Sequence, residues 1–257
     1  SSGLFILGLL AISLGMLALF LDLAHKPYVW RLYLTMKPWS PMSWGAWILL
    51  LVYPVLAAGV LLDPPRRLVE RVPVLRPLAL WMGARPLVRH ATGFVSIVTG
   101  IALGIYTGVL LSALGARPLW SSALLGPLFL VSGLSTSAAF AHWASPEPEE
   151  RVQLAWLDNL FLTIELGLIG LLLVGLLSAT EAHAQAARLL LGGPYTAVFW
   201  VGIVGLGILL PLVIQSLAVT HRIIHTPIAP ILVMLGGLAL RFVIVSAGQL
   251  SHWHRLS

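Results

Sequence analysis

The chain has 257 residues, of which 59% are hydrophobic and only 9% are charged, and its formal net charge is +6. A soluble domain carries about 25% charged residues, so this composition excludes a soluble globular protein and predicts one that lies in a lipid bilayer. The sequence also argues against a nucleic-acid partner, because the arginines stand between apolar stretches rather than along one face or in a basic tail.

Seven apolar stretches are long enough to cross a membrane, since a helix rising about 1.5 Å per residue needs roughly 20 residues for a hydrocarbon core of about 30 Å. Lipid offers no partner for backbone polar groups, so spans of this length are predicted to be helices rather than strands. The sequence therefore predicts an all-α integral membrane protein, a helical bundle that forms a single membrane domain over residues 1–257. The predicted spans are 3–21, 44–62, 92–114, 120–140, 159–179, 195–219 and 227–250.

Two features between and within these spans bear on how the bundle is organised. The longest connection, Asp63–Ala91, is interpreted as a boundary between two sub-bundles, and the acidic stretch Pro146–Arg151 as a solvated loop. In the third span Gly100, Gly104 and Gly108 recur every four residues. Small residues at this spacing let a second helix approach closely, so we expect helix packing along this stripe.

The orientation follows from the basic residues on each side. Eight Lys and Arg lie on the side of the Asp63–Ala91 connection and six on the other side, so the positive-inside rule predicts that this connection is cytoplasmic. We expect a multi-pass membrane protein. Tryptophans gather on the opposite, extracytoplasmic side, as in an interfacial aromatic belt: Trp30, Trp39, Trp44, Trp47 and Trp120.

Charged residues inside the spans are candidates for function, because each costs about 2.5–3.5 kcal/mol to insert. Glu165 lies in the fifth span with Asp158 two helical turns before it, and Arg241 lies in the seventh span with Gln249 eight residues after it. Each pair is expected to lie near one face of its helix. One interpretation is a buried Glu165–Arg241 pair that fixes helix packing. The other is a proton path that uses Glu165, with Asp158 at its cytoplasmic mouth and Arg241 tuning the proton affinity of Glu165. Gln249 is assigned to the same path.

A second group of polar residues is predicted at the extracytoplasmic ends of the spans. Asp22 and His25 follow the first span, Tyr106 approaches the end of the third, and Arg117 and Trp120 belong to the loop after it. Quinone oxygens accept hydrogen bonds and quinone reduction takes up protons, so phenol, imidazole and carboxylate groups suit a quinone pocket. Taken singly, an interfacial tyrosine and solvated helix ends explain the same residues.

Other redox groups are not expected on this chain. The histidines fall at span ends or outside the spans, so no pair is placed to hold a haem between its two nitrogens. The sequence contains no cysteine, so an iron–sulfur cluster is expected only on a partner, and no metal site is predicted.

Several segments, in order along the chain, resemble the NrfD/PsrC family of polysulfide reductase-type membrane subunits. They are Leu21-Asp22 with His25-Lys26-Pro27, Ser40-Pro41-Met42-Ser43-Trp44-Gly45-Ala46-Trp47, Tyr106-Thr107-Gly108, Ala116-Arg117-Pro118-Leu119-Trp120, and Leu240-Arg241-Phe242-Val243-Ile244-Val245 with Ala247-Gly248-Gln249. The second and fourth segments are specific when taken together.

The resemblance implies a haem-free quinone-reactive subunit of a prokaryotic inner membrane that works with an iron–sulfur protein and usually a molybdopterin catalytic subunit. It implies two adjacent four-helix bundles, with the quinone pocket on the extracytoplasmic face beneath the iron–sulfur subunit. Tyr106 would contact the quinone and Asp22 would lie nearby. The family has one more helix before the first span seen here, so we expect that helix to be missing from this sequence.

The sequence therefore predicts a membrane anchor, embedded in the lipid bilayer, that exchanges electrons between menaquinone or ubiquinone and an iron–sulfur subunit, with proton translocation as an added role. Two alternatives stay open. An ion or solute transporter often has broken helices at matching positions of two halves, and Pro211 is one break for which no partner is identified. A purely structural membrane anchor would need none of the candidate site residues.

Overall fold

The computed structural model describes residues 2–22, 28, 30–34, 37, 39–113, 115, 117–220 and 226–253. These residues form helices and no strand, and seven of the helices are long and apolar enough to cross a membrane. The prediction of an all-α membrane protein is confirmed. The seven are α1 Ser2–Asp22, α3 Pro41–Leu62, α6 Pro86–Ala113, α7 Leu125–Ala144, α8 Pro148–Ser178, the continuous pair η3 Val198–Leu209 and α10 Leu210–Val219, and α11 Ile228–Leu250.

Two helices begin well before the predicted spans. α8 begins at Pro148, so the interpretation of Pro146–Arg151 as a loop is wrong from Pro148 onward. Proline suits the first helical turn because it has no N–H to leave unpaired, and the acids Glu149 and Glu150 interact favourably with the positive helix N-terminus. α6 likewise begins at a proline, Pro86, six residues before the predicted span.

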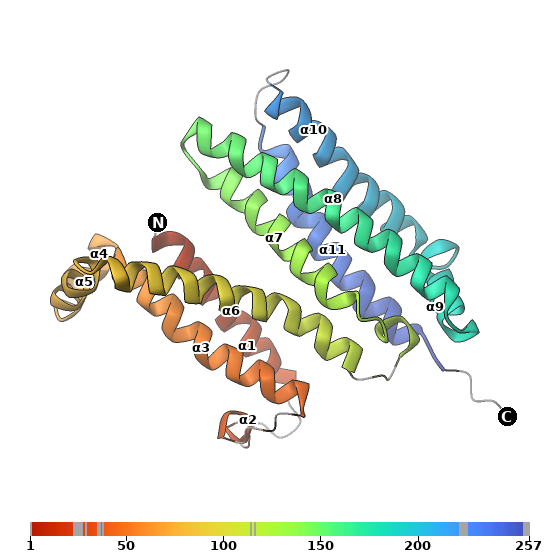
Figure 1. The fold of residues 1–257 in the computed structure, drawn as a ribbon, viewed down its shortest axis with the longest axis horizontal. Helices are drawn as coiled ribbons and strands as arrows, with labels where there is room; N and C mark the ends of the chain where they lie inside the picture. The colour runs from red at the N-terminus through yellow and green to blue at the C-terminus, as the bar shows by residue number, and fades with distance from the viewer. Residues whose placement is uncertain are drawn as a thin grey trace. The chain divides into compact units, whose positions relative to one another are not determined.

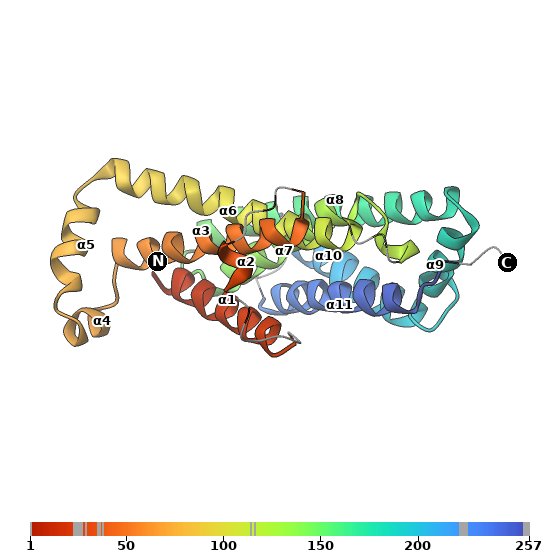
Figure 2. The same cartoon turned by 90° about the horizontal axis from the view of Figure 1, so that it is seen from below.

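The chain divides into two compact units, Ser1–Tyr106 and Thr107–Ser257. The boundary lies inside α6 and not at the Asp63–Ala91 connection, so that expectation is corrected. The connection belongs to the first unit because it folds into two short helices, α4 Arg66–Arg71 and α5 Leu75–Gly83, and α5 packs on α3. Figure 2 shows α4 and α5 between the end of α3 and the start of α6.

The first unit is held together by α1 packed along α3, with the short helix α2 Arg31–Leu34 against the same helix. Phe5 of α1 lies on Gly59 of α3, where a Cβ would overlap its ring. A Cβ at Gly8 would stand 3.5 Å from Leu56, an ordinary van der Waals contact. Glycine thus lets an aromatic side chain of one helix lie against the backbone of the other.

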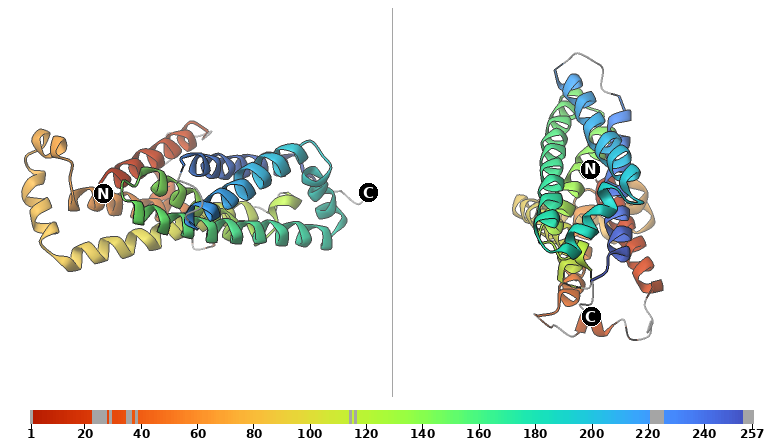
Figure 3. Two further views of the ribbon diagram at one scale, coloured as in Figure 1. Left: turned by 90° about the horizontal axis from the view of Figure 1, so that it is seen from above. Right: turned by 90° about the vertical axis from the view of Figure 1, so that its right-hand side faces the viewer.

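The second unit is a four-helix bundle of α7, α8, η3–α10 and α11, which Figure 1 and the right-hand view of Figure 3 show side by side. Two shorter helices, η2 Pro118–Trp120 and α9 Glu181–Leu191, pack at one end of it. The core between the four helices consists of large apolar side chains that are almost fully buried, among them Leu128, Leu162, Ile203, Leu240 and Ile244.

Glycine contacts set the closest approaches in the second unit. A Cβ at Gly236 of α11 would stand 2.5 Å from the Cα of Gly207 in η3, closer than real Cβ contacts come. A Cβ at Gly108 would overlap the backbone of Leu125 and Gly126, which confirms close packing at that position of the predicted stripe. A Cβ at Gly100 would meet no atom within 4 Å, so the stripe does not pack along its whole length.

We predict that Gly236→Ala destabilises the protein, because the added methyl group meets the backbone of η3 and neither helix can move without repacking the core. Overpacking of this kind costs about 1–3 kcal/mol. The measurement is the thermal unfolding midpoint of the purified protein in detergent. Gly170→Ala in α8 is the matched control, since a Cβ there meets no atom within 4 Å. Equal midpoints for the two variants would contradict the close approach.

Candidate functional site

Asp158 of α8 is at the centre of a buried polar cluster in the second unit. Its side chain is 0% exposed and accepts hydrogen bonds from Ser135 Oγ at 2.6 Å and from Gln215 Nε2 at 2.7 Å. Ser135 is on α7 and Gln215 on α10, so both carboxylate oxygens are held by neighbouring helices. Gln215 is itself 1% exposed, and its Oε1 has no hydrogen-bond partner among the described residues.

Glu165 lies seven residues after Asp158 on the same helix and is 3% exposed. It interacts with the Ser132 hydroxyl by a hydrogen bond and with the charge of Arg241. Arg241 Nη1 donates to the same hydroxyl at 3.4 Å. Ser132 of α7 therefore connects the acid on α8 with the base on α11, which gives the predicted Glu165–Arg241 interaction a third member.

The guanidinium of Arg241 is also bound to backbone carbonyl groups. Nη1 donates to Gly237 O at 2.8 Å and Nη2 to Phe129 O at 3.3 Å, and the group lies 5.8 Å from the centre of the Phe129 ring. A positive charge in an apolar bundle needs several acceptors, and these groups supply them. Arg241 thus joins α7 to α11 as well as facing Glu165.

Gln249 stands apart from this cluster. Its side chain is exposed, whereas Ala247 and Gly248 beside it are buried. Eight residues at about 100° each leave it roughly 80° from the direction of Arg241, while the seven residues between Asp158 and Glu165 leave only about 20°. The expectation that Arg241 and Gln249 share a face is corrected for this reason.

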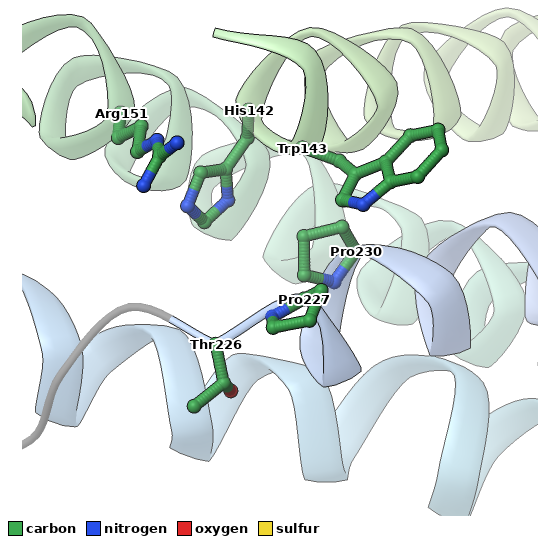
Figure 4. A pocket seen from close by; sticks show the side chains of 6 residues that line it. All are labelled: His142, Trp143, Arg151, Thr226, Pro227 and Pro230. Atoms are coloured by element: carbon green, nitrogen blue, oxygen red, sulfur yellow. The ribbon is translucent and has the colours of Figure 1, made fainter. Parts of the chain in front are cut away.

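A cavity of 220 Å³ lies at the end of the bundle where α7 ends and α8 begins. Figure 4 shows its lining: His142 and Trp143 from α7, Arg151 from α8, and Thr226, Pro227 and Pro230 around the start of α11. Arg151 precedes Asp158 by seven residues, and Ser135 precedes His142 by seven. The cavity is therefore at the end of the two helix faces that carry the buried cluster.

The residues predicted for a quinone pocket are placed as follows in the first unit. Asp22 is the last residue of α1, but its side chain lies outside the described part, as does all of His25. Tyr106 on α6 lies directly on Gly45 of α3, where a Cβ would overlap the phenol ring. Two segments that carry the family resemblance, 40–47 and 106–108, thus meet at one contact.

Arg117 and Trp120 have packing contacts within the second unit. Arg117 Nη1 donates to Ser251 O at 3.0 Å and contacts His252 Nδ1. Trp120 Nε1 donates to Ile244 O at 3.0 Å, and its ring lies where a Cβ of Gly248 would be. Both side chains attach the η2 turn to the end of α11, so each has a structural role beside any role in binding.

Sequence reasoning did not single out two phenols of the first unit. Tyr33 and Tyr53 line a cavity of 290 Å³ with Leu49 and Leu50. Burial, and to a lesser degree the neighbouring Tyr53, raises the pKa of Tyr33 above its usual 10.0, so Tyr33 stays a neutral hydrogen-bond donor at physiological pH. In the sequence, Tyr53 lies inside the predicted second span and Tyr33 lies in the loop before that span.

Ser132, Ser135 and Gln215 were not predicted either, because the prediction started from the charged residues inside the spans. Uncharged polar residues cost less to insert and are common in spans, so each alone is a weak signal. Their position on the inward face of the helices is what the structure adds. Among the described residues, no group of three His, Asp or Glu is placed to hold a metal ion.

The fold and the buried cluster define a multi-pass helical membrane protein with acids and a base held inside one four-helix bundle. Residues 1–252 match the family described as "Polysulphide reductase, NrfD", and the chain belongs to that family.

Three relatives show how far the similarity extends. The sequence is 32% identical over 256 residues to the C chain of polysulfide reductase from Wolinella succinogenes, covering 93% of this chain and 79% of that protein. It is 29% identical to protein NrfD of Escherichia coli, with 94% and 80% covered. It is 30% identical to the C subunit of tetrathionate reductase from Salmonella typhimurium, with 87% of this chain but 61% of that protein covered.

We predict that Asp158→Leu destabilises the second unit, because Ser135 and Gln215 lose their acceptor in a buried site. Unpaired buried donors cost about 1–3 kcal/mol each. Asp158→Asn keeps one acceptor oxygen and should unfold at a clearly higher temperature than the leucine variant. Circular dichroism during heating in detergent measures both. A leucine variant as stable as the parent would show that these hydrogen bonds contribute little.

Proposed function

We propose that this chain is the quinone-reactive membrane subunit of a respiratory oxidoreductase in a prokaryotic inner membrane. It exchanges electrons between menaquinone or ubiquinone and an iron–sulfur subunit on the extracytoplasmic face. The observation that carries the proposal is the contact of Tyr106 with Gly45, in a chain of the NrfD family. Two of the relatives are named as one lettered component of a reductase, which supports membership in a multi-subunit complex.

The donor set near Tyr106 fits a quinone. A quinone accepts two electrons and two protons, and its carbonyl oxygens accept hydrogen bonds. Tyr106 has a phenol that donates such a bond, and the hydroxyl end of its ring lies against α3 only because Gly45 has no side chain. Gly45 therefore fixes the direction of the phenol. Asp22, at the end of α1, and His25, three residues later, are proposed to hold and pass protons.

The proposed electron transfer requires a second redox subunit. The sequence has no cysteine to bind a cluster, so the iron–sulfur cluster belongs to a separate subunit. A molybdopterin subunit, or another respiratory subunit, then carries the terminal reaction. The chemistry of the terminal substrate is decided in that subunit's active site and not in this chain.

A proton path is proposed for the second unit. Its entrance is the cavity lined by His142 and Arg151, and its inner groups are Asp158 and Glu165. The two carboxyl groups lie seven residues apart on α8, about 10 Å along the axis, so a proton needs a carrier between them. The unpartnered Oε1 of Gln215 supplies an acceptor beside Asp158 where such a carrier can bind. Arg241 and Ser132 set the charge around Glu165.

A transporter gains no support from the helices. Pro54 lies inside α3, yet α3 stays one helix over Pro41–Leu62. The span with Pro211 is also continuous, from Val198 to Val219. Broken helices would leave backbone groups free to bind a solute, and neither of these spans is broken. If the substitutions described below leave quinone-linked turnover and proton movement unchanged, the chain is a purely structural membrane anchor.

We predict that Tyr106→Phe lowers quinone-linked turnover roughly two- to tenfold, because one hydrogen bond contributes about 0.5–1.5 kcal/mol. The phenyl ring still fills the space against Gly45, so the complex should assemble normally. Turnover with quinol and an artificial electron acceptor measures the effect. Tyr195→Phe, in the second unit, is the matched control. Full activity of Tyr106→Phe, or purified complex from which no quinone can be extracted, would overturn the proposed site.

Gly45→Ala gives an independent test of the same contact. The added methyl group overlaps the phenol ring, so Tyr106 must turn away and turnover should fall at least as far as in Tyr106→Phe. Normal turnover in this variant would show that the direction of the phenol is unimportant.

We predict that Glu165→Gln abolishes proton movement through the second unit while electron transfer from quinol continues. Gln keeps the size and hydrogen bonding of the side chain but cannot carry a proton. The ratio of protons to electrons, followed with a pH-sensitive dye in proteoliposomes, should fall relative to the parent. Glu181→Gln, on the exposed start of α9, should leave it unchanged. An unchanged ratio in Glu165→Gln would leave Glu165 and Arg241 with a packing role only.

A further inference from the structure

The connection between α3 and α6 has a strongly positive character that the redox function does not use. Residues 63–91 contain six arginines against two acids, Asp63 and Glu70. Four of these arginines have exposed side chains, namely Arg71, Arg76, Arg85 and Arg89, and of these Arg76 and Arg89 each line a cavity. Basic segments next to a membrane span attract anionic lipids.

Two cavities of the first unit open beside this connection. One, of 470 Å³, lies between the end of α3 and the helices α4 and α5, and its lining is apolar apart from Asp63 and Arg76. The other, of 330 Å³, is lined by Phe5, Gly59, Arg89 and neighbouring residues. Leu62 and Asp63 line both cavities, so the two are adjacent. Each combines an apolar wall with one arginine.

The surface around these cavities is suited to the membrane boundary. Val74 is 78% exposed, Leu80 66% and Trp81 51%, although α4 and α5 are too short to cross a bilayer. The Arg85 guanidinium lies 4.1 Å from the centre of the Trp81 ring. Exposed apolar side chains next to arginines are typical of helices that lie in the interface between lipid and water.

We propose that this surface binds one anionic phospholipid with a glycerol headgroup. Its phosphate lies with Arg76 and Arg89, and its two acyl chains occupy the adjacent cavities. Two arginines with one acid leave a positive balance that favours a negative headgroup. Asp63, which both cavities share, accepts a hydrogen bond from a headgroup hydroxyl and disfavours a bare phosphate group. The bound lipid thereby fixes α5 against the end of α3.

The test uses the purified protein, with any subunits that copurify, stripped of lipid in detergent. Native mass spectrometry measures binding of phosphatidylglycerol and of phosphatidylcholine with identical acyl chains. We expect one phosphatidylglycerol per chain, bound at least tenfold more tightly than phosphatidylcholine. Arg76→Gln and Arg89→Gln should each weaken binding roughly fivefold, and the double variant roughly thirtyfold.

Three further variants separate this site from general charge attraction. Arg76→Lys keeps the charge and should bind within about twofold of the parent. Ala79→Phe fills the larger cavity and should reduce binding of long-chain lipid without changing the net charge. Arg188→Gln, an exposed arginine of α9 in the second unit, should have no effect.

Equal affinity for the two lipids, a preference for phosphatidylethanolamine, or competition by millimolar inorganic phosphate would each overturn the proposal. So would unchanged binding in the Arg76→Gln and Arg89→Gln double variant. These arginines are exposed, so their replacement leaves the fold intact and the result can be interpreted directly.

Discussion

The cost of placing charge inside a lipid bilayer is the constraint on which this structure depends. Asp158, Glu165 and Arg241 lie in helices long and apolar enough to cross a membrane, and lipid offers none of them a partner. Their partners come from α7, α10 and the backbone, through Ser132, Ser135, Gln215 and two carbonyl groups. All four helices of the second bundle therefore contribute to one polar cluster. Removing any helix would leave a charged group facing hydrocarbon.

Close packing in lipid also depends on small residues, because the hydrophobic effect does not drive one apolar helix against another there. Gly207 and Gly236 meet backbone to backbone, and Gly59 receives the ring of Phe5. Gly45 receives Tyr106 in the same way. A side chain placed by backbone contact has little freedom to turn, so the packing rule that builds the bundles also orients the phenol proposed to meet the quinone.

The spans were predictable because length and hydropathy are set by the bilayer, and all seven appear close to their expected places. Helix starts outside the hydrocarbon region were less predictable, since Pro148 and the acids after it extend α8 into a stretch that composition suggested was a loop. Glu165 and Arg241 were found because charge in a span is rare. Ser132 and Gln215 were not, since uncharged polar residues are common there. The expectation that Gln249 shares a face with Arg241 was wrong. Residues eight apart on a helix point in clearly different directions, whereas residues seven apart point in nearly the same direction.

The two proposed activities fall in different units that are joined by one continuous helix. Tyr106 closes the first unit and Thr107 opens the second, both within α6. The contact of Tyr106 with Gly45 belongs to the first unit, and the contact of Gly108 with Leu125 and Gly126 belongs to the second. A ligand shifts a distant equilibrium only if it binds two conformations with different affinity. Coupling of quinone chemistry to the buried acids through α6 would therefore require this helix to have two conformations that bind the quinone with different affinity.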